Sequence, residues 1–161
     1  MGVLTKVVSG GQTGVDRAAL DAAAACHLER GGWCPRGRRA EDGPLDHRYP
    51  LSETPSADYE ERTLWNVRDS DATLVLAFGP PHGGTALALE VARRLGRRYR
   101  LVDLALPADA RPVSAWIVAE AIRVLNVAGP RESEAPGVQA EAFRFLGDVF
   151  SSARISPSQG P

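Results

Sequence analysis

Three glycine-rich segments carry the residues of this sequence that are best suited to bind a ligand. The first is Gly10-Gly11-Gln12-Thr13-Gly14, the second runs from Gly79 to Thr85, and the third runs from Gly129 to Ser133. Glycines let a backbone turn sharply and approach a ligand closely, and backbone N–H groups, hydroxyls and amides donate hydrogen bonds to phosphate. We therefore predict that the ligand is a phosphate-bearing small molecule.

The first segment matches neither of the two common phosphate-binding motifs. It lacks the Lys-Ser/Thr pair of a P-loop, and its glycines do not follow the G-x-G-x-x-G spacing. Its flanks still predict a strand, a tight turn and a helix, whose free N–H groups and dipole suit an anion. A glycine turn that holds no ligand remains the alternative interpretation.

Arginines extend the predicted binding site, because guanidinium groups make forked contacts with phosphate. Tyr49 and Tyr59 flank the long segment that follows Trp33 and could line a base or pterin pocket. The complete predicted ligand-binding set is Gly10, Gly11, Gln12, Thr13, Gly14, Arg17, Arg36, Arg38, Gly83, Gly84, Thr85 and Arg131.

Three acids are the candidate catalytic residues if the protein is an enzyme, namely Asp16, Glu41 and Asp42. A carboxylate can activate water or stabilise an oxocarbenium-like centre when an N-glycosidic bond is hydrolysed. Glu41 and Asp42 could equally neutralise the neighbouring arginines. Arg17, at the start of a helix, is expected to pair with a bound anion or with Asp42.

The sequence predicts no protein-bound metal. Cys26 and Cys34 form neither a C-x-x-C pair nor a zinc pattern, and His47 and His82 are not spaced with other ligands. We interpret both cysteines as reduced thiols of a cytoplasmic protein, with packing favoured over reactivity for Cys34.

The composition is that of a soluble globular domain. The 161 residues are 43% hydrophobic and 24% charged, with a formal net charge of −1, which gives no argument for a nucleic-acid or membrane partner. No apolar run reaches the roughly 18 residues of a transmembrane helix, and the start of the chain does not resemble a signal peptide. We expect a cytoplasmic protein, and a homodimer is possible.

The order of the predicted elements indicates an α/β fold. Strands are expected at 6–9, 28–33, 72–78, 99–104 and 124–128, and helices at 15–27, 59–68, 86–95, 113–122 and 138–150. This alternation predicts a Rossmann-like, doubly wound, mainly parallel sheet with helices on both faces. One domain over 1–150 and a flexible tail over 151–161 complete the prediction.

Local signals set the expected boundaries and the place of the site. Thr85 is predicted to cap the third helix, and Ser56 or Asp58 the second. The stretch from 34 to 56 shows no periodicity, and a loop of that length is usually functional or disordered. Each glycine segment follows a strand, so all three should meet at the carboxyl edge of the sheet, where such folds bind ligands.

Five motifs resemble those of a known family. They are Ser9 to Asp21, Gly31 to Gly43, Asn66 to Thr73, Gly83 to Thr85 and Asn126 to Ser133. Together, over about 7–150, they are similar to the putative molybdenum carrier family, the circularly permuted YpsA-like branch of the SLOG superfamily, which is related to lysine-decarboxylase-like proteins. The resemblance implies a Rossmann-like fold that binds the molybdenum cofactor or a nucleotide.

The resemblance also implies two other functions. Some members of the wider superfamily are phosphoribohydrolases that act on nucleoside phosphates, and others are proposed nucleotide sensors that work through a partner. The hydrolases place two acids shortly after Gly-Thr, whereas here Thr85 is followed by four apolar residues and the first acid is Glu90. We therefore expect a binding or carrier protein first, with the hydrolase and the sensor as alternatives.

Overall fold

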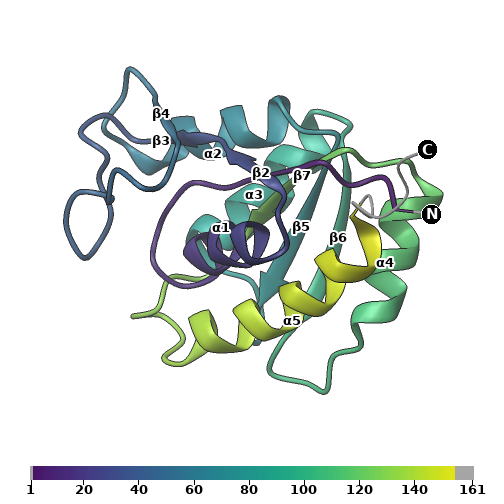
Figure 1. Cartoon of the computed structure of the whole chain (residues 1–161). Helices are drawn as coiled ribbons and strands as arrows, with labels where there is room; N and C mark the ends of the chain where they lie inside the picture. Colours follow the sequence, from purple (N-terminus) through teal and green to yellow (C-terminus); the bar gives the residue numbers. More distant parts are fainter. Residues whose placement is uncertain (1, 155–161) are drawn as a thin grey trace.

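Parallel strands form the central sheet of the computed structural model, which describes residues 2–154 (Figure 1). The strands of this sheet are β1 (Lys6–Val8), β2 (Glu29–Gly31), β5 (Ala72–Ala77), β6 (Arg98–Asp103) and β7 (Val124–Ala128). All neighbouring pairs are parallel. Two further strands, β3 (Trp33–Cys34) and β4 (Ser52–Glu53), form a small parallel pair of their own.

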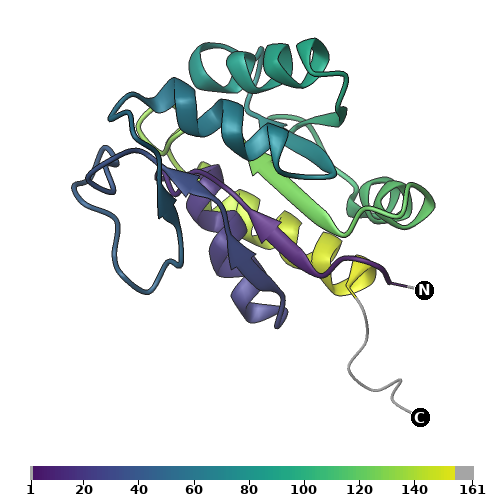
Figure 2. The same ribbon diagram turned by 90° about the horizontal axis from the view of Figure 1, so that it is seen from above.

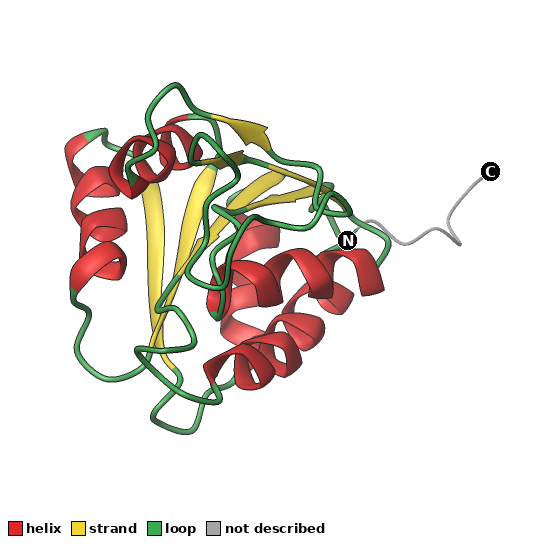
Figure 3. Ribbon diagram, turned by 90° about the vertical axis from the view of Figure 1, so that its left-hand side faces the viewer, coloured by secondary structure: helices red, strands yellow, loops and turns green. Residues whose placement is uncertain are grey.

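Helices cover both faces of the sheet, and the predicted fold class is confirmed (Figures 2 and 3). They are α1 (Val15–Ala25), α2 (Tyr59–Arg68), α3 (Gly83–Arg94), α4 (Ala110–Ala119) and α5 (Val138–Ala153). Helices α1, α4 and α5 pack together on one face, and α2 and α3 pack together on the other. This distribution follows from the right-handed crossovers that join parallel strands.

The strand order is β2-β1-β7-β5-β6. If β7 is counted first, this becomes 3-2-1-4-5, the order found in Rossmann sheets. The two ends of the described chain also meet, because the Val3 N–H donates to the Ala153 carbonyl at 2.8 Å and Leu4 forms a bridge with Arg154. The end of α5 therefore lies where an unpermuted chain would continue directly into β1.

The largest core cluster lies between the sheet and the helices α1 and α5. Leu74, Leu76 and Leu125 project from the central strands and are fully buried. Alanines of α1, such as Ala18 and Ala22, are buried against them. Such small side chains let the helix pack closely against the sheet. The apolar area buried between them is the main contribution to stability.

Some predicted boundaries are wrong. Helix α3 begins at Gly83, so Thr85 lies within its first turn and does not cap it. Asp58 occupies the N-cap position of α2, but its side chain makes no capping bond. Ser52–Glu53 is a strand inside the stretch predicted to be irregular. These differences arise because tertiary contacts override local cap and turn preferences.

The end of the chain departs from the prediction as well. Helix α5 continues to Ala153, so the first residues of the predicted tail are helical. The remainder of that tail, from 155 onward, lies outside the described residues. Within 2–154, no helix has both the length and the apolar character that crossing a membrane requires.

Candidate functional site

A cleft of about 800 Å³ opens at the carboxyl ends of β5 and β7. These neighbouring strands lead to helices on opposite faces, because α3 follows β5 and α5 follows β7. The cleft therefore lies at the topological switch point of the sheet, where α/β folds bind ligands. Its walls come from the β1–α1 turn with the start of α1, the first half of α2, the part of α3 up to Glu90 and the loop after β7.

The first turn of α3 presents free hydrogen-bond donors to this cleft. Gly83, Gly84 and Thr85 line it, and among the described residues their backbone N–H groups have no partner. A Cβ atom built on Gly84 would meet no atom within 4 Å, so the space before the turn is open. Free N–H groups and the positive helix end together favour an anion here.

The first turn of α1 is filled by protein groups instead. The Gly14 N–H donates to Gln139 Oε1 at 2.9 Å, and the Val15 N–H donates to the Pro130 carbonyl at 3.2 Å. The free helix start that the sequence predicted at this turn is therefore wrong for these two groups. Tertiary contacts from the β7 loop and from α5 occupy it.

The glycines of the first turn give close approach to protein atoms. A Cβ at Gly10 would lie 1.9 Å from Arg62 Nη1, and one at Gly14 would lie 2.4 Å from the Pro130 carbonyl oxygen. A Cβ at Gly11 would lie 2.7 Å from Leu45 Cδ2. The turn therefore serves as a junction on which α2, the long loop and the β7 loop converge.

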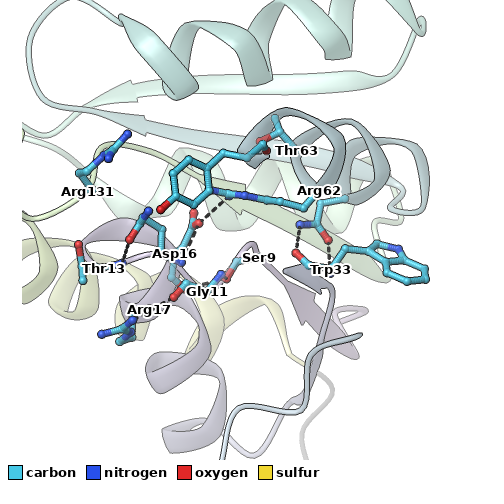
Figure 4. A network of polar contacts seen from close by, with 12 residues as sticks. Ser9, Gly11, Thr13, Asp16, Arg17, Trp33, Arg62, Thr63 and Arg131 are labelled. Atoms are coloured by element: carbon cyan, nitrogen blue, oxygen red, sulfur yellow. Dashed lines mark hydrogen bonds and ion pairs between the residues drawn. The ribbon is translucent and has the colours of Figure 1, made fainter. Parts of the chain in front are cut away.

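Asp16 and Arg62 form a buried ion pair in the cleft wall (Figure 4). Arg62 Nη1 lies 3.1 Å from Asp16 Oδ2, and the side chains are 13% and 4% exposed. Burial raises the pKa of Asp16 above its ordinary value, although the charge of Arg62 opposes the shift. The same Asp16 oxygen accepts the Gln12 N–H at 3.3 Å.

Gln12 has a fixed side-chain amide. Its Oε1 accepts the Thr13 N–H at 3.1 Å and the Glu41 N–H at 2.9 Å, which determines which end of the amide is the nitrogen. Gln12 is only 6% exposed and lines the cleft, and its Nε2 has no acceptor among the described residues.

Glu41 and Asp42 hold loops together and do not line the cleft. Glu41 accepts hydrogen bonds from the Thr13 and Ser133 hydroxyls and from the Ser133 N–H. Desolvation would raise the pKa of Glu41, but these hydrogen bonds and the charge of Arg131 together hold the pKa below its ordinary value. Asp42 pairs with Arg17 at 2.5 Å, one of the two partners expected for that arginine.

The two arginines of the long loop that were predicted to bind the ligand, Arg36 and Arg38, have other roles or none in the cleft lining. Arg38 donates to four carbonyl groups of its own loop, those of Leu45, Asp46, Tyr49 and Leu51. Arg36 is exposed, and neither arginine lines the cleft. Arg38 thus organises the interior of a loop whose sequence shows no regular pattern.

Arg131 reaches the cleft from the loop after β7 (Figure 4). Its Nε lies 2.9 Å from Glu134 Oε1, while the other Glu134 oxygen lies 3.4 Å from His82 Nδ1. Glu134 therefore places a carboxylate next to the open end of α3. Arg131 also lies 5.6 Å from the centre of the Tyr59 ring.

Of the two tyrosines expected to line a ring pocket, only one lies in the cleft, and the Cys34 thiol is buried elsewhere. Tyr59 lines the cleft, whereas Tyr49 is 2% exposed and packs with Leu20 and Cys34 in a separate core cluster. Burial raises the pKa of the Cys34 thiol, which opposes formation of a nucleophilic thiolate.

The cleft brings together part of the predicted set. Its lining includes Gln12, Asp16, Gly83, Gly84, Thr85 and Arg131. The predicted residues outside its lining are Gly10, Gly11, Thr13, Gly14, Arg17, Arg36, Arg38, Glu41 and Asp42. Ligand contacts by this second group remain predictions of the sequence alone.

The cleft also contains residues that the sequence did not predict for the site, among them Arg62 and Glu134. Arg62 lies one helical turn after Tyr59, a spacing that could have placed it beside that ring, but its partner Asp16 is 46 residues away. Glu134 directly follows the third glycine segment and carries no motif of its own. Among the described residues, no group of three or more His, Cys, Asp or Glu side chains is placed to hold a metal ion.

The fold and the cleft define a Rossmann-like α/β protein with a circularly permuted strand order and a ligand-sized cleft at its switch point. The chain belongs to the Circularly permutated YpsA SLOG family, which it matches over residues 7–150. The permuted connection seen between α5 and β1 accords with that family description.

A solved structure gives a second comparison. The chain is 40% identical to a protein from Syntrophus aciditrophicus SB described as "Putative molybdenum carrier protein", whose crystal structure was determined at 1.45 Å resolution. The match covers 92% of this chain and 96% of that one, with a TM-score of 0.86. The comparison with curated proteins gives no match.

Proposed function

We propose that this protein binds and carries a heterocyclic phosphate ester, with the molybdenum cofactor as the first candidate and a nucleotide as the second. The observation that carries the proposal is the open first turn of α3 in the cleft, where Gly83, Gly84 and Thr85 present free N–H groups. The name of the Syntrophus protein supports the choice of cargo.

We assign the phosphate to the first turn of α3 because two N–H groups at the start of α1 already have protein partners. The N–H groups at Gly14 and Val15 are already used by Gln139 and Pro130. Arg131 lines the same cleft and can make a charge-assisted contact to a phosphate oxygen. Carboxylates also line the cleft, at Asp58, Glu60, Glu90 and Glu134. Their charges repel an anion, and the Glu134 carboxylate does so at the α3 turn itself.

The residues present fit the molybdenum cofactor, which consists of a pterin, a phosphate and a metal-binding dithiolene. The cleft of about 800 Å³ is within the range of small-molecule sites. The turn of α3 and Arg131 would hold the phosphate, and Tyr59 and Gln12 would contact the ring. The cofactor is cargo in this proposal, so the protein needs to bind, shield and release it without changing it.

We rank the hydrolase below the carrier because of where the acids lie. Of Asp16, Glu41 and Asp42, only Asp16 lines the cleft, and Arg62 holds its carboxylate. Glu90, the first acid after Thr85, also lines the cleft, but its carboxylate pairs with Arg94 at 3.0 Å. A nucleotide sensor that acts through a partner would use the same cleft, and a ligand-dependent change in oligomeric state would favour it.

The test measures ligand binding and ligand fate together. Purified protein is titrated with inorganic phosphate, nucleoside monophosphates and molybdopterin, while the unfolding temperature is followed and the ligand is analysed by mass spectrometry. Ligand at 100 times its dissociation constant should add about 2.7 kcal/mol of stability and stay intact. Release of free base or phosphate would overturn the carrier in favour of the hydrolase.

Paired glycine variants show whether the α3 turn holds the phosphate. Gly84→Glu adds a carboxylate where a Cβ meets open space, and should reduce phosphate binding at least tenfold. Gly147→Glu, at another glycine with open space, lies on α5 and should leave binding unchanged. Equal effects of both variants, or none from either, would contradict the assignment.

A further inference from the structure

Gln12 carries a hydrogen-bond donor that the protein itself does not use. Its Oε1 is held by the N–H groups of Thr13 and Glu41, so the amide cannot flip without losing both bonds. Its Nε2 has no acceptor among residues 2–154, although Gln12 is only 6% exposed. Buried donors without acceptors are uncommon in native proteins and call for an explanation.

Asp16, one helical turn along, carries the complementary acceptor. Its Oδ2 receives the Gln12 N–H at 3.3 Å and Arg62 Nη1 at 3.1 Å. No described residue donates to its Oδ1. Both residues line the cleft, so an unused donor and an unused acceptor belong to the wall of the same cavity.

We propose that Gln12 and Asp16 read the edge of the ligand's nitrogen heterocycle, with Gln12 Nε2 donating to a ring acceptor and Asp16 Oδ1 accepting from the adjacent N–H. This inference rests on the proposed function, because it assigns the second end of the same ligand whose phosphate binds at α3. The ligand class is a phosphate ester of a ring that offers an acceptor beside a donor, as pterins and purines do.

A second anionic group is excluded from this position by charge. The Asp16 carboxylate would repel a phosphate or carboxylate at Gln12, and its charge is already shared with Arg62. A neutral ring edge satisfies both groups at once and leaves the ion pair intact. Sites built to hydrogen-bond a ligand reject analogues that leave their buried groups unpaired.

The aromatic ring of Tyr59 supports a planar ligand in the same cleft. Tyr59 and Arg62 are both lining residues, and the Arg62 guanidinium carbon lies 5.3 Å from the centre of the Tyr59 ring. A flat heterocycle bound against this ring would gain stacking while its edge faces Gln12. Ribose alone would gain neither contact.

The experiment compares ligands that share a phosphate and differ in the ring. Guanosine monophosphate, adenosine monophosphate, 1-methylguanosine monophosphate and ribose 5-phosphate are titrated calorimetrically into the wild type. At least one unmodified nucleotide should bind tenfold or more tightly than ribose 5-phosphate, and methylation at N1 should abolish the gain for guanine. The guanine and adenine titrations distinguish a 6-oxo from a 6-amino edge.

Variants at position 12 tie this preference to the proposed contact. Gln12→Glu keeps the acceptor for Thr13 and Glu41 and replaces the free donor, so it should cost the nucleotide at least tenfold more affinity than it costs ribose 5-phosphate, which loses only what the added charge repels. Gln12→Met should show the same selective loss, and unfolding temperatures report whether either variant folds. N1-methylation should still weaken guanosine monophosphate binding in both variants, because it removes the N–H that Asp16 accepts and position 12 does not touch.

The outcomes separate this inference from the proposed function. The ring-edge contact would be overturned if the wild type bound nucleotide and ribose 5-phosphate with equal affinity. It would also be overturned if the two ligands lost affinity equally in both variants. Either result would leave the phosphate site unaffected. Failure of all four ligands to bind the wild type would overturn both.

Discussion

Asp16 of α1 and Arg62 of α2 form a buried ion pair that joins elements on opposite faces of the sheet. The pair spans 3.1 Å, and its Arg62 Nη1 atom lies in the space that a Cβ on Gly10 would fill. Glycine at position 10 is therefore matched to an arginine 52 positions further along the chain. The pair closes one wall of the cleft and holds the carboxylate that we assign to ligand recognition.

Replacing Arg62 by Met should destabilise the protein strongly, because it leaves the Asp16 carboxylate buried without its partner. Removal of one member of such a pair costs about 3 to 5 kcal/mol. Urea unfolding at pH 7.5 measures the loss. Arg68→Met removes an exposed pair with Asp69 from the same helix and should cost about 0.5 kcal/mol or less.

The penalty of Arg62→Met should shrink as the pH falls. The folded pKa of Asp16 lies above its ordinary value of 3.8, so its contribution to stability decreases as pH rises from that value through the folded pKa. Loss of Arg62 raises the folded pKa further and extends this window upward. Unfolding measured at several values between pH 5 and 8 tests the sign, and a penalty that grows toward acid would contradict it.

Glu41→Gln should loosen the junction between the first turn and the β7 loop. The hydrogen bonds from Thr13 and Ser133 go to an ionised acceptor on an exposed side chain, so we expect a loss of about 1 kcal/mol at pH 7. Because the folded pKa of Glu41 is lowered, its stabilisation is present above the ordinary value of 4.5 and is lost as pH falls through the folded pKa.

The check on Glu41 is a comparison of unfolding free energies from pH 7 down to pH 3. Wild type and Glu41→Gln should converge at the acid end. Glu90→Gln removes an exposed pair with Arg94 and should cost less than about 0.5 kcal/mol. A difference between wild type and Glu41→Gln that stays constant with pH would show that charge is not involved.

Gly14→Ala should be far more damaging than Gly37→Ala, although both glycines have a left-handed φ, of +80° and +83°. A Cβ at Gly37 meets nothing within 4 Å, so that variant should cost only the conformational penalty of about 1 to 2 kcal/mol. A Cβ at Gly14 clashes with the Pro130 carbonyl, which should bring the total to about 2 to 4 kcal/mol. Thermal unfolding of the two variants decides, and equal losses would show that the β7 loop simply moves aside.

Glu134→Gln should strengthen phosphate binding. The Glu134 carboxylate lies beside the open turn of α3, 3.4 Å from His82, and competes for Arg131. Removing its charge should tighten binding of inorganic phosphate three- to tenfold, about 1 kcal/mol. Calorimetry of Glu141→Gln, which pairs with Arg144 on α5, gives the matched control. Weaker binding by Glu134→Gln would mean that the carboxylate positions Arg131 for the ligand.

The candidate site could be predicted from the sequence only in part. Gly83, Gly84 and Arg131 follow buried strands, and strand ends in a parallel sheet meet at one edge, so their convergence was foreseeable. The filled start of α1 was not, because Gln139 and Pro130 occupy it from more than 100 positions further along the chain. Glycine content marks both helix starts alike and does not say which one stays open.

The sequence by itself determined the α/β class and the position of nearly every element. The six apolar or β-branched residues of β5, all buried, and the ten residues of α2 each lie in one short stretch of sequence. The local pattern of residue types is enough to predict such elements. Only the tertiary structure decided the order of the strands in the sheet, the Asp16–Arg62 pair and the free donor on Gln12. Those features depend on which segments, far apart in the sequence, lie next to each other in the fold. That arrangement results from the packing of the whole chain, so no local pattern in the sequence reveals it.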